Sequence, residues 1–200
     1  MRDRVVKAIG SLATSHRAGL AACLLALAAV SGCGGNDRDA LAASSAISFT
    51  LPDFYLPPGS SLAWRSDVVY LFEDHSRTPE HVTPYLQQEI QALLEARGYR
   101  FTGSAAEADH GLVAVIVLGE GLTASRVLQE FRLTPSFNPD RRYQKGTIVV
   151  AIYRTADEKV VWRGAIQANV DLDLPPEQRR ARVREHAGRL LARIPARPPG

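Results

Sequence analysis

Apolar positions along the chain follow the spacing of strands in several places. Residues 112–118 form an unbroken apolar run rich in β-branched side chains, which predicts a central strand covered on both faces. Residues 147–153 and 159–166 flank a short polar segment and predict a β-hairpin. Partial alternation between Phe49 and Phe72, interrupted by Leu-Pro-Pro-Gly, predicts two short strands around a loop.

Helical spacing occurs in two long segments. The first runs over residues 79–97, and Gly98 follows at the position that favours a left-handed C-cap. Its apolar stripe consists of Val82, Leu86, Ile90, Leu93 and Leu94. The second begins near Pro175 and is stopped by Pro195. Its apolar stripe consists of Val183, Ala187, Leu190, Leu191 and Ile194.

Shorter elements complete the pattern. Residues 99–102 predict a short strand, residues 122–131 a short helix, and residues 135–145 a polar loop. Strands combined with two long amphipathic helices indicate an α/β two-layer sandwich. The expected sheet is mixed and mostly antiparallel, with two main amphipathic helices on one face. This single domain is expected to span residues 47–197.

The N-terminal segment has a different character. Positive charges at Arg2, Arg4, Lys7 and Arg17 precede an apolar run over residues 18–30. A membrane-spanning helix needs about 20 such residues, so this run of 13 fits a signal peptide better. The segment is therefore expected to be a leader rather than part of the fold.

The residues that end the apolar run, Val30-Ser31-Gly32-Cys33, resemble the lipobox of bacterial lipoproteins. The resemblance implies cleavage after Gly32, removal of residues 1–32, and lipid attachment to Cys33. The alternative is an ordinary secretory signal cut near Ser31, with Cys33 incidental. Residues 33–46 would then be the lipidated cysteine and a flexible tether of small and polar residues. In the sorting pattern of enterobacterial lipoproteins, aspartate directly after the cysteine retains the protein in the inner membrane. Gly34 stands at that position here, which by this resemblance implies the outer membrane, with the domain facing the periplasm.

Composition and charge exclude several classes. The 200 residues are 46% hydrophobic and 22% charged, as in globular proteins. The net charge of +3 belongs to the predicted leader, because residues 33–200 hold 20 basic and 20 acidic side chains. A neutral domain argues against nucleic-acid binding. With Cys23 removed and Cys33 lipidated, the mature domain would have no disulfide, thiolate metal site or cysteine nucleophile.

Few residues suggest chemistry. The predicted mature chain contains four histidines, His75, His81, His110 and His186. Glu73 and Asp74 stand beside His75, but the spacing to His81 matches no zinc motif and favours a solvated loop. Asp171 and Asp173 would share one face of an extended segment, which is also ordinary strand patterning. The sequence therefore predicts no catalytic residue, no metal site and no cofactor.

Arginines crowd the last predicted helix. They are Arg179, Arg180, Arg182, Arg184, Arg189 and Arg193. They could meet lipid headgroups or an acidic partner. The alternative is a solvated face whose side-chain stems cover apolar surface.

Several motifs in order resemble the lipoproteins that carry the domain of unknown function 4136 (DUF4136), over residues 47–194. They are Trp64, Leu-Glu-Ala-Arg-Gly-Tyr at 94–99, Ala-Asp at 108–109, Gly-Thr-Ile-Val-Val at 146–150 and Val-Trp-Arg-Gly-Ala at 161–165. His110 departs from the pattern of that family, which often has an apolar residue directly after the aspartate. The resemblance implies a periplasm-facing envelope lipoprotein and supplies no catalytic residues.

Two functions remain open. The first is a non-enzymatic binding or structural module, anchored by acyl chains on Cys33, with an unknown envelope protein or apolar ligand as partner. The second is an accessory lipoprotein of a lipid or small-molecule transport system, with an apolar groove between helix and sheet. A cavity above roughly 300 Å³ would favour transport, and a filled core with an exposed patch would favour a protein partner. A hydrolase is a third, less supported alternative.

Overall fold

The computed structural model of the protein describes residues 36–72, 85–119 and 121–197. The chain divides into two compact units, residues 1–40 and 41–200. The second unit contains an open sheet whose strands are β1 (Ser44–Thr50), β2 (Ser61–Trp64), β3 (Val69–Phe72), β4 (Arg100–Phe101), β5 (His110–Leu118), β6 (Gln144–Arg154) and β7 (Val160–Val170). The helices of the described chain are α2 (Asn36–Ala42), α3 (Tyr85–Glu95), α4 (Leu122–Glu130) and α5 (Pro176–Leu191).

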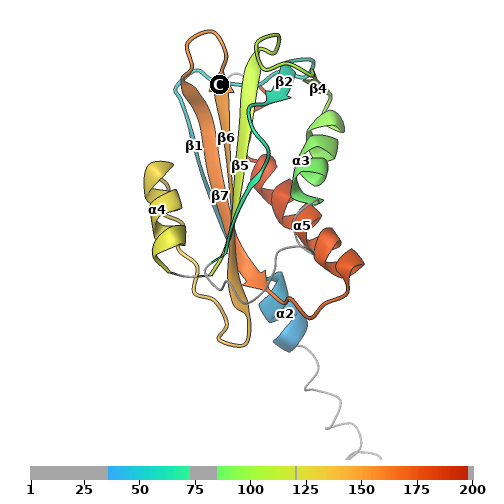
Figure 1. Cartoon of the computed structure of the whole chain (residues 1–200), viewed down its shortest axis with the longest axis vertical. Coiled ribbons are helices and arrows are strands. Elements are labelled where there is room, and N and C mark those ends of the chain that lie inside the picture. Colours follow the sequence, from blue (N-terminus) through green and yellow to red (C-terminus); the bar gives the residue numbers. More distant parts are fainter. Residues whose placement is uncertain (1–35, 73–84, 120, 198–200) are drawn as a thin grey trace, which may run out of the picture. The chain divides into compact units, whose positions relative to one another are not determined.

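The sheet has the strand order β1-β7-β6-β5-β2-β4, and β3 also pairs with β5. The long pairs β1–β7, β7–β6 and β6–β5 are antiparallel. The short strands β2 and β3 run parallel to β5, one along its start and the other along its end. Helices α3 and α5 lie on one face of the sheet and α4 lies on the other (Figure 1). The α/β fold with a mixed, mostly antiparallel sheet and two main helices on one face is therefore confirmed.

The larger core lies between the sheet and helices α3 and α5. Alternate residues of the central strands point into it, and Leu112, Ile152 and Trp162 are fully buried there. The predicted stripes of the two helices supply the opposite wall, through Leu86, Ile90, Leu94, Leu190 and Leu191. Gly164 allows close contact, because a Cβ at this position would lie 2.8 Å from Leu190 Cδ1.

The other face of the sheet holds a smaller core under α4. It contains Val117 of β5, Val149 of β6 and Ala165 of β7, packed against Ala124 and Leu133. Strand β5 is thus buried on both faces, as its unbroken apolar run predicts. The C-cap prediction is also confirmed, because Gly98 has φ +85° and its N–H donates to the carbonyl of Glu95.

The structure differs from the sequence predictions in three places. Asn36–Ala42 forms a helix and β1 begins at Ser44, where residues 33–46 were expected to be a flexible tether. Three strands rather than two lie between residues 44 and 72. The hairpin strands are longer than predicted, so β6 takes up the end of the expected loop. Helix α3 begins at Tyr85, and residues 79–84 of the predicted helix lie outside the described part.

Candidate ligand-binding pocket

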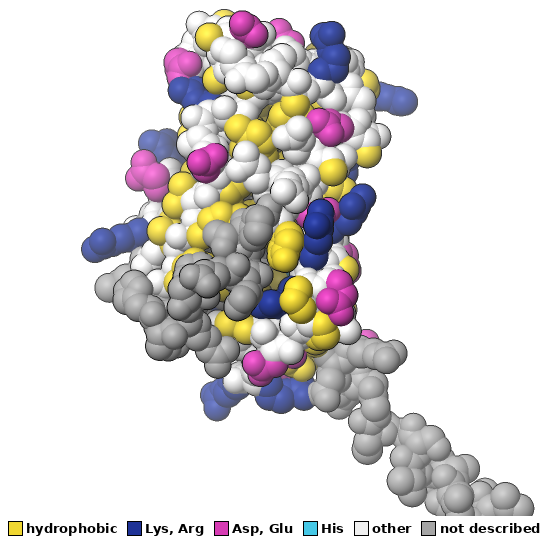
Figure 2. All heavy atoms as spheres, turned by 45° about the vertical axis from the view of Figure 1, so that its right-hand side comes forward, with side chains coloured by type: hydrophobic (Ala, Val, Ile, Leu, Met, Phe, Trp, Pro, Cys, Tyr) yellow, Lys and Arg dark blue, Asp and Glu magenta, His cyan; other side chains and the backbone are white. Residues whose placement is uncertain are grey.

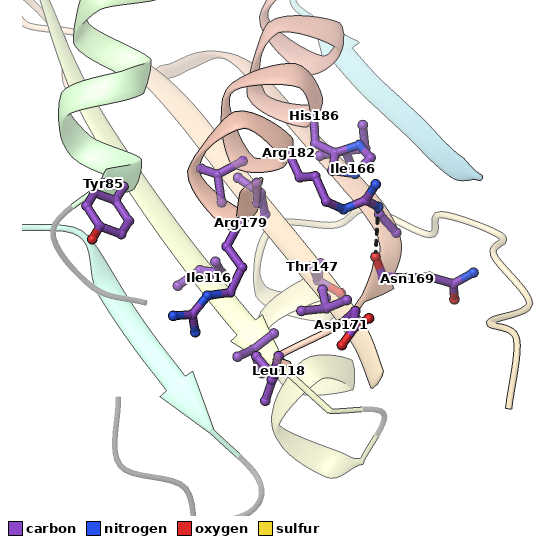
Figure 3. Close-up of a pocket in the computed structure, with 16 residues that line it drawn as sticks. Tyr85, Ile116, Leu118, Thr147, Ile166, Asn169, Asp171, Arg179, Arg182 and His186 are labelled. Atoms are coloured by element: carbon purple, nitrogen blue, oxygen red, sulfur yellow. Dashed lines mark hydrogen bonds between the residues drawn. The ribbon is translucent and has the colours of Figure 1, made fainter. Parts of the chain in front are cut away.

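A mainly apolar pocket lies between α5 and the ends of β5, β6 and β7 (Figure 3). Its apolar wall includes Ile116, Leu118, Ile148, Ile166 and Val183. The cavity volume is about 70 Å³, well below the roughly 300 Å³ typical of sites for drug-sized ligands. The pocket therefore suits a short apolar segment rather than a whole two-chain lipid.

His186 is a buried polar side chain in the wall of this pocket. It is 6% exposed, and neither imidazole nitrogen has a hydrogen-bond partner within the described structure. Burial lowers the pKa of His186 to about 4, and the nearby positive charge of Arg182 acts in the same direction. His186 is therefore neutral at neutral pH, with one nitrogen able to donate and the other able to accept a hydrogen bond.

Arg182 lies one helical turn before His186 in the same wall. Its guanidinium donates to the carbonyl oxygens of Leu41 and Asn169, the latter at 3.2 Å (Figure 3). Burial lowers the pKa of Arg182, while the carboxylates of Glu185 and Asp171 oppose this shift. The carbonyl oxygens accept hydrogen bonds from the guanidinium but do not neutralise its charge. A negatively charged group in contact with it would therefore stabilise it further.

Arg179 and Asp171 complete the charged part of the lining (Figure 3). The Nε atom of Arg179 is buried and has no hydrogen-bond partner among the described residues. Two arginines and one aspartate line the pocket, beside the neutral His186. The lining therefore carries an excess of one positive charge.

The two helices beside the pocket are joined by a buried carboxylate. The side chain of Glu89 on α3 is 3% exposed and accepts from Arg180 Nε at 2.5 Å and from Arg184 Nη1 at 3.1 Å. Both arginines belong to α5, and about half of each side chain is exposed. These ion pairs fix α5 against α3 and so fix the pocket wall that α5 provides.

Several residues weighed in the sequence analysis lie outside the described part of the chain. These are Cys33, Glu73, Asp74, His75 and His81. Lipidation of Cys33 stays a prediction, and so does the interpretation of the other four as part of a solvated loop.

His110 lies at the start of β5, at the opposite end of this strand from the pocket residues Ile116 and Leu118. Its ring packs edge-on against Phe54, with centroids 5.7 Å apart, and burial lowers its pKa. The neighbouring Asp109 accepts from the N–H and Oγ of Ser61 at 2.9 and 2.6 Å, and these bonds lower its pKa. The pair Asp109–Ser61 joins the segment before β5 to β2, which indicates a structural role.

Asp171 and Asp173 are not a pair of acids on a strand. Both follow the end of β7, and the Asp171 carboxylate accepts a hydrogen bond of 2.9 Å from the Asp173 N–H. This contact is typical of a turn built by its own aspartate. Only Asp171 lines the pocket.

The arginines of α5 mostly serve contacts within the domain. Arg180 and Arg184 bind Glu89, and Arg189 donates to Glu185, Ser44 and the Ala42 carbonyl. These contacts favour the interpretation of the arginines as parts of the fold. Figure 2 shows several of the Lys and Arg side chains of this face standing beside acidic ones.

An apolar groove between helix and sheet was expected from the sequence only as part of the transport hypothesis, and the residues that line the pocket were not predicted. A signal for it was present, since His186 follows Val183 by three residues and precedes Leu190 by four, which places it on the apolar stripe of α5. The contribution of Asp171 depends on the turn after β7, which spacing does not show.

Residues 36–72, 85–119 and 121–197 contain no cluster of three or more histidine, cysteine, aspartate or glutamate side chains that could hold a metal ion. Within these ranges no helix has the length and apolar character needed to cross a membrane.

Comparisons with solved structures show a shared fold at low sequence identity. A DUF4136 family protein from Bacteroides thetaiotaomicron matches with a TM-score of 0.50 and 12% identity, covering 76% of this chain and 97% of that one. A PelC dodecamer from Paraburkholderia phytofirmans matches with a TM-score of 0.48 and 11% identity, covering 78% of this chain and 99% of that one. No curated protein matches the chain.

The family model described as "Domain of unknown function (DUF4136)" matches residues 59–196, from just before β2 to beyond the end of α5. The matched part includes the pocket lining and all five motifs on which the resemblance rests. The lipobox lies before the matched residues and stays a prediction. The chain belongs to the DUF4136 family.

Proposed function

We propose that this protein is a lipid-anchored module of the bacterial envelope, facing the periplasm, whose folded domain binds a small ligand and catalyses no reaction. Acyl chains on Cys33 would hold it on the membrane, most simply the outer membrane given Gly34. The observation that supports a binding role is the apolar pocket beside α5, which contains buried polar groups that have no hydrogen-bond partner among the described residues.

Unpartnered polar groups in a cavity favour a ligand over a purely structural role. A buried polar atom without a hydrogen bond costs free energy, so native proteins leave few of them unless a ligand, water or reaction uses them. Of the seven such side-chain atoms in the described part of the chain, three belong to this pocket, namely both nitrogens of His186 and the Nε of Arg179. A bound molecule would pair these atoms and fill the apolar space.

The volume of the pocket beside α5 argues against whole lipids as its ligand, whereas a second, more open cavity of about 360 Å³ beside Tyr99 and Ile194 exceeds the volume given above as favouring transport. About 70 Å³ holds a short chain or a single ring, whereas a two-chain lipid needs several times more. One specific observation favours the transport hypothesis: the pocket lies between helix and sheet, as that hypothesis expects. The molecules transported through this pocket would then be small and apolar.

The test is to identify what the protein carries. The full chain is purified from membranes in detergent, extracted with organic solvent, and the extract is analysed by mass spectrometry. A Val183→Phe variant is the matched control, because the larger side chain would fill the pocket from α5. We expect a small apolar compound in the extract of the wild-type protein and its loss from the variant. Identical extracts from both proteins would contradict the proposed binding role.

A further inference from the structure

Neither arginine of the pocket lining has a carboxylate in direct contact among the described residues. Arg182 is half-buried and donates to the carbonyl oxygens of Leu41 and Asn169, while the carboxylates of Glu185 and Asp171 act on it only at a distance. A cation withdrawn from water is stabilised by a counter-charge that accepts its hydrogen bonds. Because Arg182 lines the pocket, an anion bound there would supply such a counter-charge.

Two further donors of the same pocket are without acceptors in the described structure. Arg179 has a buried Nε–H, and His186 is neutral with one N–H and one bare nitrogen. An oxyanion accepts from several N–H groups at once, and arginine binds carboxylates in a planar, two-pronged geometry. Figure 3 shows the Arg179 guanidinium on the Ile116 side of the pocket and the Arg182 guanidinium directed toward Asn169, so one small oxyanion would pair both when the Arg179 side chain turns inward.

The charge balance limits this anion to a single negative charge. The lining contains two arginines and one aspartate, so a monoanion brings it to neutrality. A dianion such as a phosphate monoester would leave an excess negative charge beside Asp171. The remaining wall is apolar, with Ile116, Ile148 and Ile166 facing Val183, and accepts a short hydrocarbon body.

From this arrangement we infer that the pocket binds a carboxylate carried on a short apolar chain, with the carboxylate at Arg179, Arg182 and His186. The inference rests on the proposed binding role of the pocket and specifies its ligand class. The apolar body contributes affinity by leaving water, and the oxyanion contributes selectivity by satisfying the buried donors. A neutral molecule of the same shape lacks the second contribution.

The experiment measures binding of labelled hexanoate to the full chain in phosphatidylcholine nanodiscs by equilibrium dialysis. Hexanol is the neutral probe, hexyl phosphate the dianionic probe, and acetate the anion without a chain. Nanodiscs that contain the Val183→Phe variant report binding to lipid and to other surfaces. Hexanoate dissolves well in water, so little of it enters the nanodisc lipid.

We expect hexanoate to bind about tenfold more tightly than hexanol, and acetate and hexyl phosphate to bind at least tenfold more weakly than hexanoate. Arg179→Gln and Arg182→Gln should each weaken hexanoate about tenfold and leave hexanol within twofold. Arg179→Gln is the cleaner variant, because Arg182 also holds the Leu41 carbonyl. Arg189→Gln is the matched control, since Arg189 also donates to a carbonyl of this segment but does not line the pocket.

The outcomes separate this inference from the proposed function. Equal binding of hexanol and hexanoate to the wild-type chain, absent in Val183→Phe, would overturn the carboxylate assignment and keep the binding role. No difference between wild type and Val183→Phe for any probe would overturn both. Tighter binding of hexyl phosphate than of hexanoate, or an equal loss in Arg189→Gln, would overturn the assignment to a monoanionic carboxylate at these arginines.

Discussion

His186 makes the stability of the domain depend on pH. Its pKa is about 4 in the folded protein and about 6.5 in an unfolded chain. As the pH falls from about 6.5 to about 4, His186 binds a proton in the unfolded state but stays neutral in the folded state. The free energy of unfolding therefore decreases over this range, by about 3 kcal/mol in total, and is unaffected by this group above pH 7.

Urea unfolding of the full chain at pH 7 and pH 4.5 measures this dependence. His110, whose pKa is also lowered by burial, changes stability in the same direction, so the comparison needs a variant that keeps it. His186→Leu is that variant, because an apolar side chain suits the pocket wall and cannot titrate. We expect wild type to lose about 2 kcal/mol more than the variant. Parallel losses in the two proteins would show that His186 is not the titrating group.

Trp162 is the largest fully buried side chain of the main core. Trp162→Ala should lower the free energy of unfolding by about 3–5 kcal/mol, because it removes buried apolar surface and leaves a cavity. Trp162→Phe is the matched control. The indole N–H has no hydrogen-bond partner in the described structure, so this variant loses packing but no hydrogen bond and should cost clearly less. Equal costs for the two variants would contradict this account of the core.

At the scale of elements, the contact between α3 and α5 depends on an asymmetric ion pair. Glu89 is buried, while Arg180 and Arg184 are about half-exposed. The double variant Arg180→Gln/Arg184→Gln leaves a buried carboxylate without its partners and should cost about 2–3 kcal/mol in the free energy of unfolding. The expected loss of stability is smaller than for a fully buried ion pair, because water reaches the half-exposed arginine side of this contact.

A triple variant tests whether the cost comes from the unpaired charge. Adding Glu89→Leu to the double variant replaces the carboxylate by an apolar side chain in an apolar site. We expect it to restore most of the stability, as measured by urea unfolding, because no buried charge remains. If the triple variant is less stable than the double variant, the ion pair contributes net stability and this account is wrong.

Elements with strong periodicity could be predicted from the sequence. These elements are the hairpin of β6 and β7, the buried strand β5, and helices α3 and α5. Each has an apolar pattern of strand or helix period that can be recognised within its own segment. The placement of α4 on the opposite face could not be predicted, because it depends on Val117, Val149 and Ala165 presenting a second apolar surface across three strands. The helix Asn36–Ala42 was missed, since its small and polar residues are equally typical of a tether.

At the scale of the whole molecule, the pocket was harder to predict than the fold. It is formed by the ends of β5 and β7, the start of β6, Tyr85 of α3 and residues 179–186 of α5, which are far apart in the chain. Single residues such as His186 gave a local signal, but Arg182 becomes distinctive only through its contact with the Leu41 carbonyl, 141 positions earlier. Sites assembled from several elements need the tertiary structure before their charges can be compared.

The last prediction concerns how the whole molecule reaches the membrane. If Cys33 is acylated, Cys33→Ser should abolish labelling by an alkyne-bearing palmitate analogue and leave the protein as an uncleaved precursor or in the soluble fraction. Each buried methylene contributes about 0.8 kcal/mol, so several chains on one cysteine hold a protein firmly whereas one holds it marginally. Cys23→Ser is the matched control, because Cys23 lies within the predicted leader and should not affect labelling of the mature protein. If the Cys33→Ser protein still incorporates the label and still sediments with membranes, Cys33 is not the lipid anchor. The same result would contradict the alternative of an ordinary secretory signal cut near Ser31, because that cleavage would release the domain from the membrane.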